Sequence, residues 1–325
     1  MLLLHSIRKL RRRITVAETR EAIPVYLAGV LYCCAAAVFW ALGPVFLKKG
    51  LAFLDHTEMS ASRTIGFAAA SLIFCIFDPN AFILWRFPSR LLLFVFLNIL
   101  VGNVLGDLCY FKSLELIGVS RAVGTTCCYP LFVTAISFFW LGESVTLPLV
   151  LGTGVMIAGL FMLKSGGRKA PGAAPETASW KGFLLALAAA FCWAAVMVLQ
   201  KWLLSVHDLP AASITLWRAL FLFAVSWGIW AWRTRKEPEK RLHLLRAPRE
   251  IWASAVAAGI FGLAAGGYVF ALAIQIIPVS VATPITATSP LIAAGMAVVL
   301  FHESMRPVQW AGILCILGGV LTVSA

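Results

Sequence analysis

Charged residues are scarce in this sequence. Of its 325 residues, 13% are charged and 61% are hydrophobic, whereas soluble domains carry roughly a quarter charged residues. The composition therefore excludes a water-soluble core. Apolar runs of about 20 residues, each long enough to cross a bilayer, recur along the whole chain. Because backbone amides in lipid must be satisfied within their own segment, we expect these runs to form helices.

Acidic residues are scarcer still, with 14 Asp and Glu against 27 Lys and Arg, and the net charge is +13. The basic residues fall almost entirely between the apolar runs, where they would meet lipid headgroups. No basic patch alternates with aromatic residues on a polar helix, as a nucleic-acid surface would require. The sequence thus predicts the lipid bilayer as a partner and argues against nucleic acid.

Motifs for cofactors are also lacking. None of the eight cysteines has CxxC spacing, and all lie within or beside apolar runs, so we interpret them as packing residues. The sequence contains no GxxxxGK[ST] loop, which argues against ATP as the energy source. We therefore expect no cofactor, no metal site and no catalytic residue.

The apolar runs that are present predict an all-α polytopic membrane protein with ten transmembrane helices. Five are predicted at 25–48, 58–77, 92–112, 121–141 and 147–164, and five more at 181–204, 212–232, 251–273, 281–301 and 308–324. A basic tail, 1–24, precedes them. A linker rich in Gly, Pro and Ala, 165–180, separates two halves, 25–164 and 181–325.

The two halves repeat one pattern. Residues 129–144 read YPLFVTAISFFWLGES, and residues 289–304 read SPLIAAGMAVVLFHES. Matches at nearly the same offset extend through both halves. Five helices is an odd number, so the second half enters from the opposite face and the repeats are inverted. Inverted repeats place a substrate site at their interface near the bilayer midplane, with alternating access by rocking of the halves.

Motifs in each half resemble those of a known family. They are AVFWALGPVFLKKG and AAFCWAAVMVLQKWL near the start of the halves, GDLCYFKSLELIGVSRA within the first, and LGESVTLPLVLGTGVMIAGLFML with FHESMRPVQWAGILCILGGVLTV at their ends. Over about residues 25 to 325 the chain resembles the EamA-like, ten-helix members of the drug/metabolite transporter superfamily. The resemblance implies a multi-pass transporter of small metabolites in the cell (inner) membrane, often an exporter and often coupled to protons or exchange.

Arg63 and Asp107 are ionisable residues inside predicted helices, where charge is costly and function is the default hypothesis. Each lies about five residues from a helix end at the same membrane face, so the two can form an ion pair. One interpretation is a structural lock. The other makes Asp107 a proton acceptor or a ligand for a substrate ammonium group.

Arg218 has the position in the second half that Arg63 has in the first, but Gly267 stands where the counterpart of Asp107 would be. Arg218 therefore lacks the equivalent acid. It either binds a carboxylate or phosphate of the substrate, or extends its long side chain to the nearer surface.

Aromatic and helix-breaking residues supply the other candidates. Residues deep enough to stack on a flat or cationic solute, with core packing as the alternative, are Trp40, Trp193, Tyr110 and Tyr129. Prolines that interrupt the fourth helix of each half, and the threonines one turn before them, are Pro130, Pro290, Thr126 and Thr286. Proline frees backbone carbonyls, which the threonines either satisfy or leave to line a site.

Four charged residues at helix ends are interpreted as structural: Glu143, Glu303, Lys48 and Lys201. Each Glu is predicted to offset the positive end of the helix that follows it. Each Lys is predicted to offset the negative end of its own helix.

Orientation, direction and assembly stay open. Basic residues in the tail favour a cytoplasmic N-terminus, but the opposite face carries more of them, including seven between 233 and 250. We expect export of a small amino acid-like or drug-like substrate, with protons as a candidate coupling ion, by a monomer or homodimer. An importer or exchanger of sugar or nucleotide-linked solutes is the alternative. A membrane-embedded enzyme or scaffold is more remote, because Asp107 has no catalytic partner at its depth.

Overall fold

The structure is a computed structural model, and it describes residues 22–81, 87, 89–165, 179–236, 243–289, 291–292 and 307–324. Within these ranges the regular secondary structure is helical. Six helices of the described chain are long and apolar enough to span a membrane, and three shorter apolar helices of 10–17 residues accompany them. These features are those of a polytopic helical membrane protein.

The helices follow the apolar runs. The first half contains α2 (Ala22–Leu51), α3 (His56–Phe77), α4 (Ser89–Ile99), η2 (Leu100–Gly106), α5 (Asp107–Thr126), α6 (Tyr129–Leu141) and α7 (Leu147–Ser165). The second half contains α8 (Trp180–Val206), α9 (Ala211–Thr234), α11 (Arg249–Ala258), η3 (Gly259–Ala265), α12 (Gly266–Ile276), α13 (Val279–Thr286) and α15 (Pro307–Ser324).

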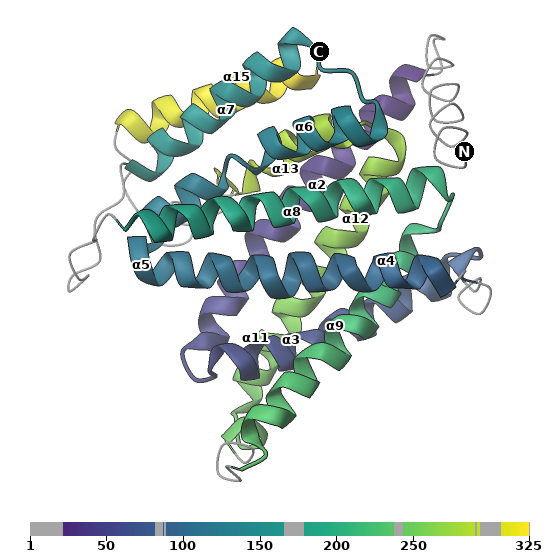
Figure 1. The fold of residues 1–325 in the computed structure, drawn as a ribbon, viewed down its shortest axis with the longest axis vertical. Coiled ribbons are helices and arrows are strands. Elements are labelled where there is room, and N and C mark those ends of the chain that lie inside the picture. The colour runs from purple at the N-terminus through teal and green to yellow at the C-terminus, as the bar shows by residue number, and fades with distance from the viewer. Residues whose placement is uncertain are drawn as a thin grey trace.

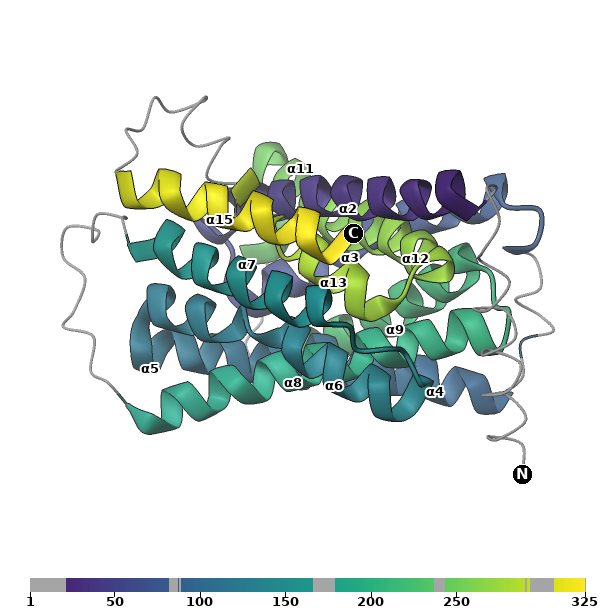
Figure 2. The same ribbon diagram turned by 90° about the horizontal axis from the view of Figure 1, so that it is seen from above.

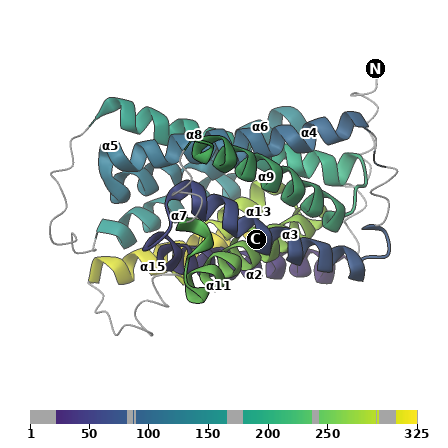
Figure 3. The same ribbon diagram turned by 90° about the horizontal axis from the view of Figure 1, so that it is seen from below.

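Helices of the two halves are interleaved (Figure 1). α7 and α15 lie side by side along one edge of the bundle, which faces the viewer in Figure 2. α3, α9 and α11 lie at the opposite edge, which faces the viewer in Figure 3. Between these edges α8 packs against α5, and α2 packs against α12. The two halves therefore share one core instead of forming separate bundles.

The first helix of each half packs on the third helix of the other half. α2 contacts η3 and α12 at a point where a Cβ on Gly43 would lie 3.0 Å from the Cα of Gly262. α8 contacts η2 and α5 in the same way, with the side chain of Val196 against Gly102. Glycine lets helices approach closely, and close packing is a main source of attraction between helices in lipid.

Each half also contains one π-helical segment. η2 and η3 are seven residues long and occupy equivalent places in the two halves. Each lies within the third helix, where the first helix of the other half crosses it. Segments of π-helix are rare and frequently lie at functional sites.

The fourth predicted helix differs from the prediction in two respects. α5 is helical throughout 113–120, which we predicted as a loop, whereas Pro278 separates α12 from α13 at the equivalent point because it lacks an amide hydrogen. The predicted interruption is present near Pro130, which lies in the first turn of α6 after a break at residues 127–128. Pro130 therefore begins a helix and does not kink one. Pro290 lies outside the described residues.

Glu143 does not serve the helix that follows it, so this prediction is wrong. Its carboxylate accepts hydrogen bonds from the backbone nitrogens of Val279 (2.8 Å) and Ser280 (3.0 Å), and from Oγ of Ser280 (2.6 Å). Glu143 therefore caps α13 in the other half of the chain. The reason is that the side chain is buried, where a carboxylate requires nearby donors.

The prediction for Lys201 is also wrong, because its side chain does not offset the negative end of its own helix, α8. Its ammonium group donates to the carbonyl oxygens of Ile274 and Ile277, at the C-terminal end of α12. Glu143 and Lys201 thus hold the turn between α12 and α13 from two sides. Glu303 and the side chain of Lys48 lie outside the described residues.

Candidate functional site

Arg63 and Asp107 meet in the structure. Nη2 of Arg63 lies 3.6 Å from Oδ2 of Asp107, and the two side chains are 14% and 21% exposed. A third group comes from the second half, since Nε1 of Trp193 donates to Oδ1 of Asp107 at 3.3 Å. Asp107 therefore links α3, α5 and α8, and it is contacted from both halves of the chain.

Asp107 lies in the wall of a pocket of about 200 Å³ between α3, α5 and α9. Ser60, Asn103 and Ser226 add neutral polar groups, and none of their side chains hydrogen-bonds to another described residue. His56, Thr57 and Arg233 also line the pocket, and the apolar part of the wall consists of Val104, Leu108, Phe111, Leu222, Val225 and Ile229. A mostly apolar wall with a few polar groups is typical of sites for small molecules.

The ends of α3 and α9 define two faces of the molecule. Arg233, near the end of α9, donates to Oγ1 of Thr57 in the first turn of α3. At the other end of this antiparallel pair, Sγ of Cys75 lies 3.4 Å from the carbonyl oxygen of Ala212. We call these the Thr57 face and the Cys75 face. Because Thr57 and Arg233 also line the pocket, it extends from Asp107 toward the Thr57 face.

Arg218 forms no ion pair with another described residue. Its Nη1 donates to Oε1 of Gln200 at 3.3 Å, while Nε of Arg218 and Nε2 of Gln200 are buried and bond to no described residue. A Cβ placed on Gly267 would lie 3.8 Å from Nη1 of Arg218, so the position of the missing acid is open. Gln200 is itself buried. Nε of Arg218 is therefore buried, while the residue as a whole is partly exposed.

Trp40 and Trp193 have equivalent packing and different chemistry. Trp193 lies against Gly106, and Trp40 lies against Gly266, so each ring fills the space above a glycine of the other half. Trp193 also contacts the ring of Tyr110, with 5.2 Å between centroids. These two aromatic residues lie together beside Asp107. Trp40 instead packs against the ring of a buried phenylalanine, as core packing predicts.

The other predicted residues lie away from Asp107. The hydroxyl of Tyr129 donates to the carbonyl oxygen of Thr283 at 3.2 Å, and the hydroxyl of Thr286 donates to the same oxygen at 3.1 Å. Thr126 is buried beside the break between α5 and α6. None of these candidates lines the Asp107 pocket. Tyr129 and Thr286 belong to the contact between the two halves at α6 and α13.

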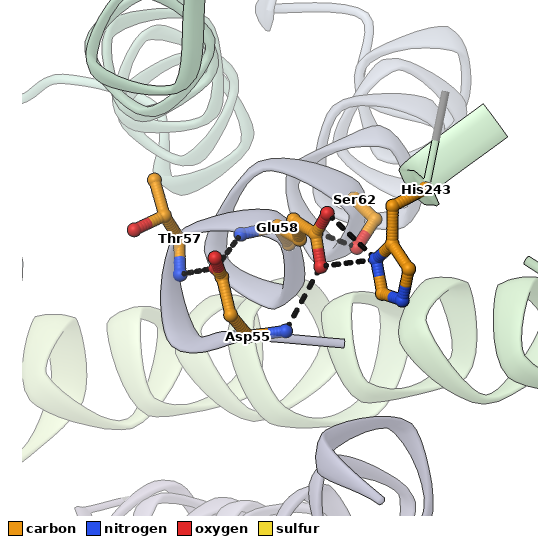
Figure 4. Close-up of polar contacts among 5 residues, drawn as sticks. All are labelled: Asp55, Thr57, Glu58, Ser62 and His243. Carbon is orange, nitrogen blue, oxygen red and sulfur yellow. Dashed lines mark hydrogen bonds and ion pairs between the residues drawn. The ribbon is translucent and has the colours of Figure 1, made fainter. Parts of the chain in front are cut away.

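Sequence reasoning missed a network of polar contacts at the Thr57 face (Figure 4). Asp55 caps α3 by accepting from the backbone nitrogens of Thr57 (2.7 Å) and Glu58 (2.8 Å), and Glu58 accepts from the backbone nitrogen of Asp55 (2.9 Å). The Glu58 carboxylate also lies 3.0 Å from Nδ1 of His243, between α9 and α11. The D-x-x-E spacing signals such a cap. Nothing in the sequence near His243 signals its partner.

Comparison with known proteins decides the family. The profile of the EamA-like transporter family matches residues 27–165 and 180–325. The chain belongs to the EamA-like transporter family. This EamA-like protein is 26% identical to an uncharacterized transporter of Archaeoglobus fulgidus over 297 residues, which cover 90% of this chain and 96% of that protein.

Two further relatives agree with this assignment. The EamA-like protein is 32% identical over 141 residues to an uncharacterized inner membrane transporter, YhbE, of Escherichia coli, covering 43% of this chain and 41% of YhbE. A solved crystal structure shares its fold, with a TM-score of 0.70 at 20% identity, over 90% of this chain and 95% of the other. The family and the names of the relatives point to membrane transporters and not to enzymes.

Proposed function

We propose that this EamA-like protein is a secondary active transporter, which exports a small amino acid-like or drug-like metabolite across the inner membrane by alternating access. One observation carries the proposal: the carboxylate of Asp107 lies in the wall of a pocket and is contacted from both halves. A group held in this way changes its contacts whenever the halves move relative to each other.

The proposed architecture is ten helices in two inverted five-helix repeats. Three features support it. The second helices of the two halves, α3 and α9, run antiparallel. The π-helical segments η2 and η3 occupy equivalent places. The pairs Trp40 with Gly266 and Trp193 with Gly106 exchange partners between the halves, as a two-fold relation predicts.

We infer that Asp107 is the residue at which substrate and proton compete. While Asp107 is ionised, its attraction to Arg63 holds α3 to α5, and this attraction is stronger in the apolar interior than in water. A proton, or the ammonium group of a substrate, neutralises the carboxylate and weakens that attraction. Exchange of one cation for the other at Asp107 would therefore couple proton entry to substrate exit.

A second candidate function follows from Arg218. A partly buried guanidinium whose only described partner is neutral favours an anionic ligand, since burying an unpaired charge is costly. This favours an importer or exchanger of carboxylated, phosphorylated or nucleotide-linked solutes. The two candidates make opposite predictions about substrate charge.

The experiment is solute flux in proteoliposomes that contain the full chain, across a panel of cationic, zwitterionic and anionic solutes, with and without a pH gradient. We expect flux of an amine-containing solute that the gradient accelerates and that Asp107→Asn abolishes. Asp208→Asn is the matched control, because Asp208 is an exposed acid outside the pocket with φ of 51°, a conformation that Asn tolerates. Equal flux in the Asp107 variant and wild type would refute the proposed site.

A further inference from the structure

A second pocket lies at the Thr57 face, at the end of α9. Its volume is about 320 Å³. Three cationic residues at the end of α9 and just beyond it line the pocket: Arg233, Arg235 and Lys236. All three are exposed. The opposite wall is the first turn of α3, with Asp55 and Thr57. The pocket is therefore concave, cationic and open to the outside of the bundle.

The acid in this wall offsets only one of the three positive charges. Oδ1 of Asp55 accepts from the backbone nitrogens of Thr57 and Glu58, where it caps α3. The pocket thus contains three positive charges against one carboxylate that is already engaged. Arg233 is fixed in place by its hydrogen bond to Thr57.

Two tryptophans complete the pocket. Trp230 is one of the lining residues, but its Nε1 is buried and is therefore not accessible to a ligand in the open pocket. Trp232 is 64% exposed, and the guanidinium of Arg235 lies 5.4 Å from the centre of its ring. The three cations are hydrogen-bond donors, and together they favour an acceptor that carries negative charge.

The position of the pocket along α9 indicates which kind of molecule supplies the negatively charged acceptor. α9 is an apolar span of 24 residues, and the pocket lies in its last turn and just beyond it. Tryptophans and cations at the end of a span lie at the level of lipid headgroups. The negative end of the α9 dipole accounts for a single cation near its C-terminus, but three cations around a concavity exceed that requirement.

We propose that this pocket binds the phosphate of an anionic phospholipid, with phosphatidylglycerol as the test ligand. Arg233, Arg235 and Lys236 pair with the phosphate, and Trp230 forms part of the same wall. Trp232 faces the adjoining lipid. Basic pockets at the ends of membrane spans provide this chemistry for anionic headgroups. The proposal is independent of which solute the protein carries.

The test is native mass spectrometry of the full-length protein, titrated in detergent with phosphatidylglycerol or with phosphatidylcholine. We expect wild type to bind phosphatidylglycerol more tightly than phosphatidylcholine. Arg235→Gln with Lys236→Gln should weaken phosphatidylglycerol binding by roughly tenfold or more, since each cation near a headgroup contributes substantially. The matched control is Arg246→Gln with Arg249→Gln, which removes the same charge from exposed residues that do not line the pocket.

The outcomes separate the proposal from its rivals. Loss of binding in the pocket variant with less than a twofold change in the control supports a built site. Equal losses in the two variants would mean nonspecific attraction to a basic face and would overturn it. Addition of inorganic phosphate gives the third arm, because competition at concentrations similar to the lipid would assign the pocket to a soluble anion instead. Thermal unfolding of each variant confirms that it is folded.

Discussion

Arg63 and Arg218 have equivalent positions in the two halves and opposite surroundings. Arg63 faces Asp107 at 3.6 Å, with Trp193 on the other carboxylate oxygen. Arg218 faces a glycine and shares a single hydrogen bond with the neutral Gln200. Among the described residues, Arg63 thus has a carboxylate partner and the equivalent Arg218 has none. The two halves therefore share their packing at these positions and differ in the polar partners of the equivalent arginines.

The largest expected effect comes from removing the carboxylate that pairs with Arg63. Asp107→Asn removes the proposed coupling group and leaves Arg63 without a counter-charge, so flux should fall by roughly a hundredfold or to background. The free energy of unfolding should fall by less than the roughly 3–5 kcal/mol of a fully buried pair, because Asp107 is 21% exposed. Proteoliposome flux and thermal unfolding measure the two effects.

The double variant Asp107→Asn with Arg63→Gln decides between the two interpretations of the pair. A structural lock predicts that removing both charges restores stability and flux together. A transport role predicts restored stability with flux still absent. Recovery of flux in the double variant would therefore remove Asp107 from the proposed mechanism.

The next test makes the second half resemble the first. Gly267→Asp places a carboxylate opposite Arg218, where a Cβ would lie 3.8 Å from the guanidinium. We expect a folded protein in which flux of anionic solutes falls by about tenfold, because the new carboxylate occupies the guanidinium. Gly267→Asn is the control of equal size. If the Asp and Asn variants transport equally, Arg218 is not an anion ligand.

A smaller effect on flux is expected when the equivalent residues Trp193 and Trp40 are each replaced by phenylalanine. Trp193→Phe removes the donor to Asp107, and a hydrogen bond to a charged group contributes about 1.5–3 kcal/mol, so flux should fall by up to about tenfold for this long bond. Trp40→Phe removes the same part of the ring from Gly266 but no hydrogen bond to a charged group, and should change flux by less than about twofold. Equal effects would show that the indole nitrogen is not what distinguishes the halves.

The smallest effect concerns His207 at the Cys75 face. Partial burial and the nearby Arg90 lower the pKa of His207, while Asp208 opposes them. The unfolded chain therefore binds the proton more readily than the folded protein, and stability should decrease as pH falls below about 6.5. His207→Gln should reduce this decrease in melting temperature by about 1 °C between pH 7.5 and 5.5. An unchanged pH profile would contradict the assignment.

The sequence predicted best where a charge stands in an apolar run. Arg63, Asp107 and the unmatched Arg218 are visible because such residues are rare inside helices, and the structure brings the first two together. Gln200 was missed because a neutral amide does not stand out in an apolar helix. The partners of Glu143 were missed because they lie 136 and 137 residues away, in the other half. Local spacing carries no information about such distant contacts.

Because Glu143 and its partners lie far apart in the sequence, their hydrogen bonds join the two halves of the chain mechanically. The carboxylate of Glu143, just after the end of α6, accepts hydrogen bonds from the first amides of α13. The ammonium group of Lys201, in α8, donates hydrogen bonds to the last carbonyls of α12. The corner between α12 and α13 therefore cannot shift without pulling on α6 and α8 at the same time. A displacement of any one of these four helices at this corner therefore strains the hydrogen bonds that join it to the other three.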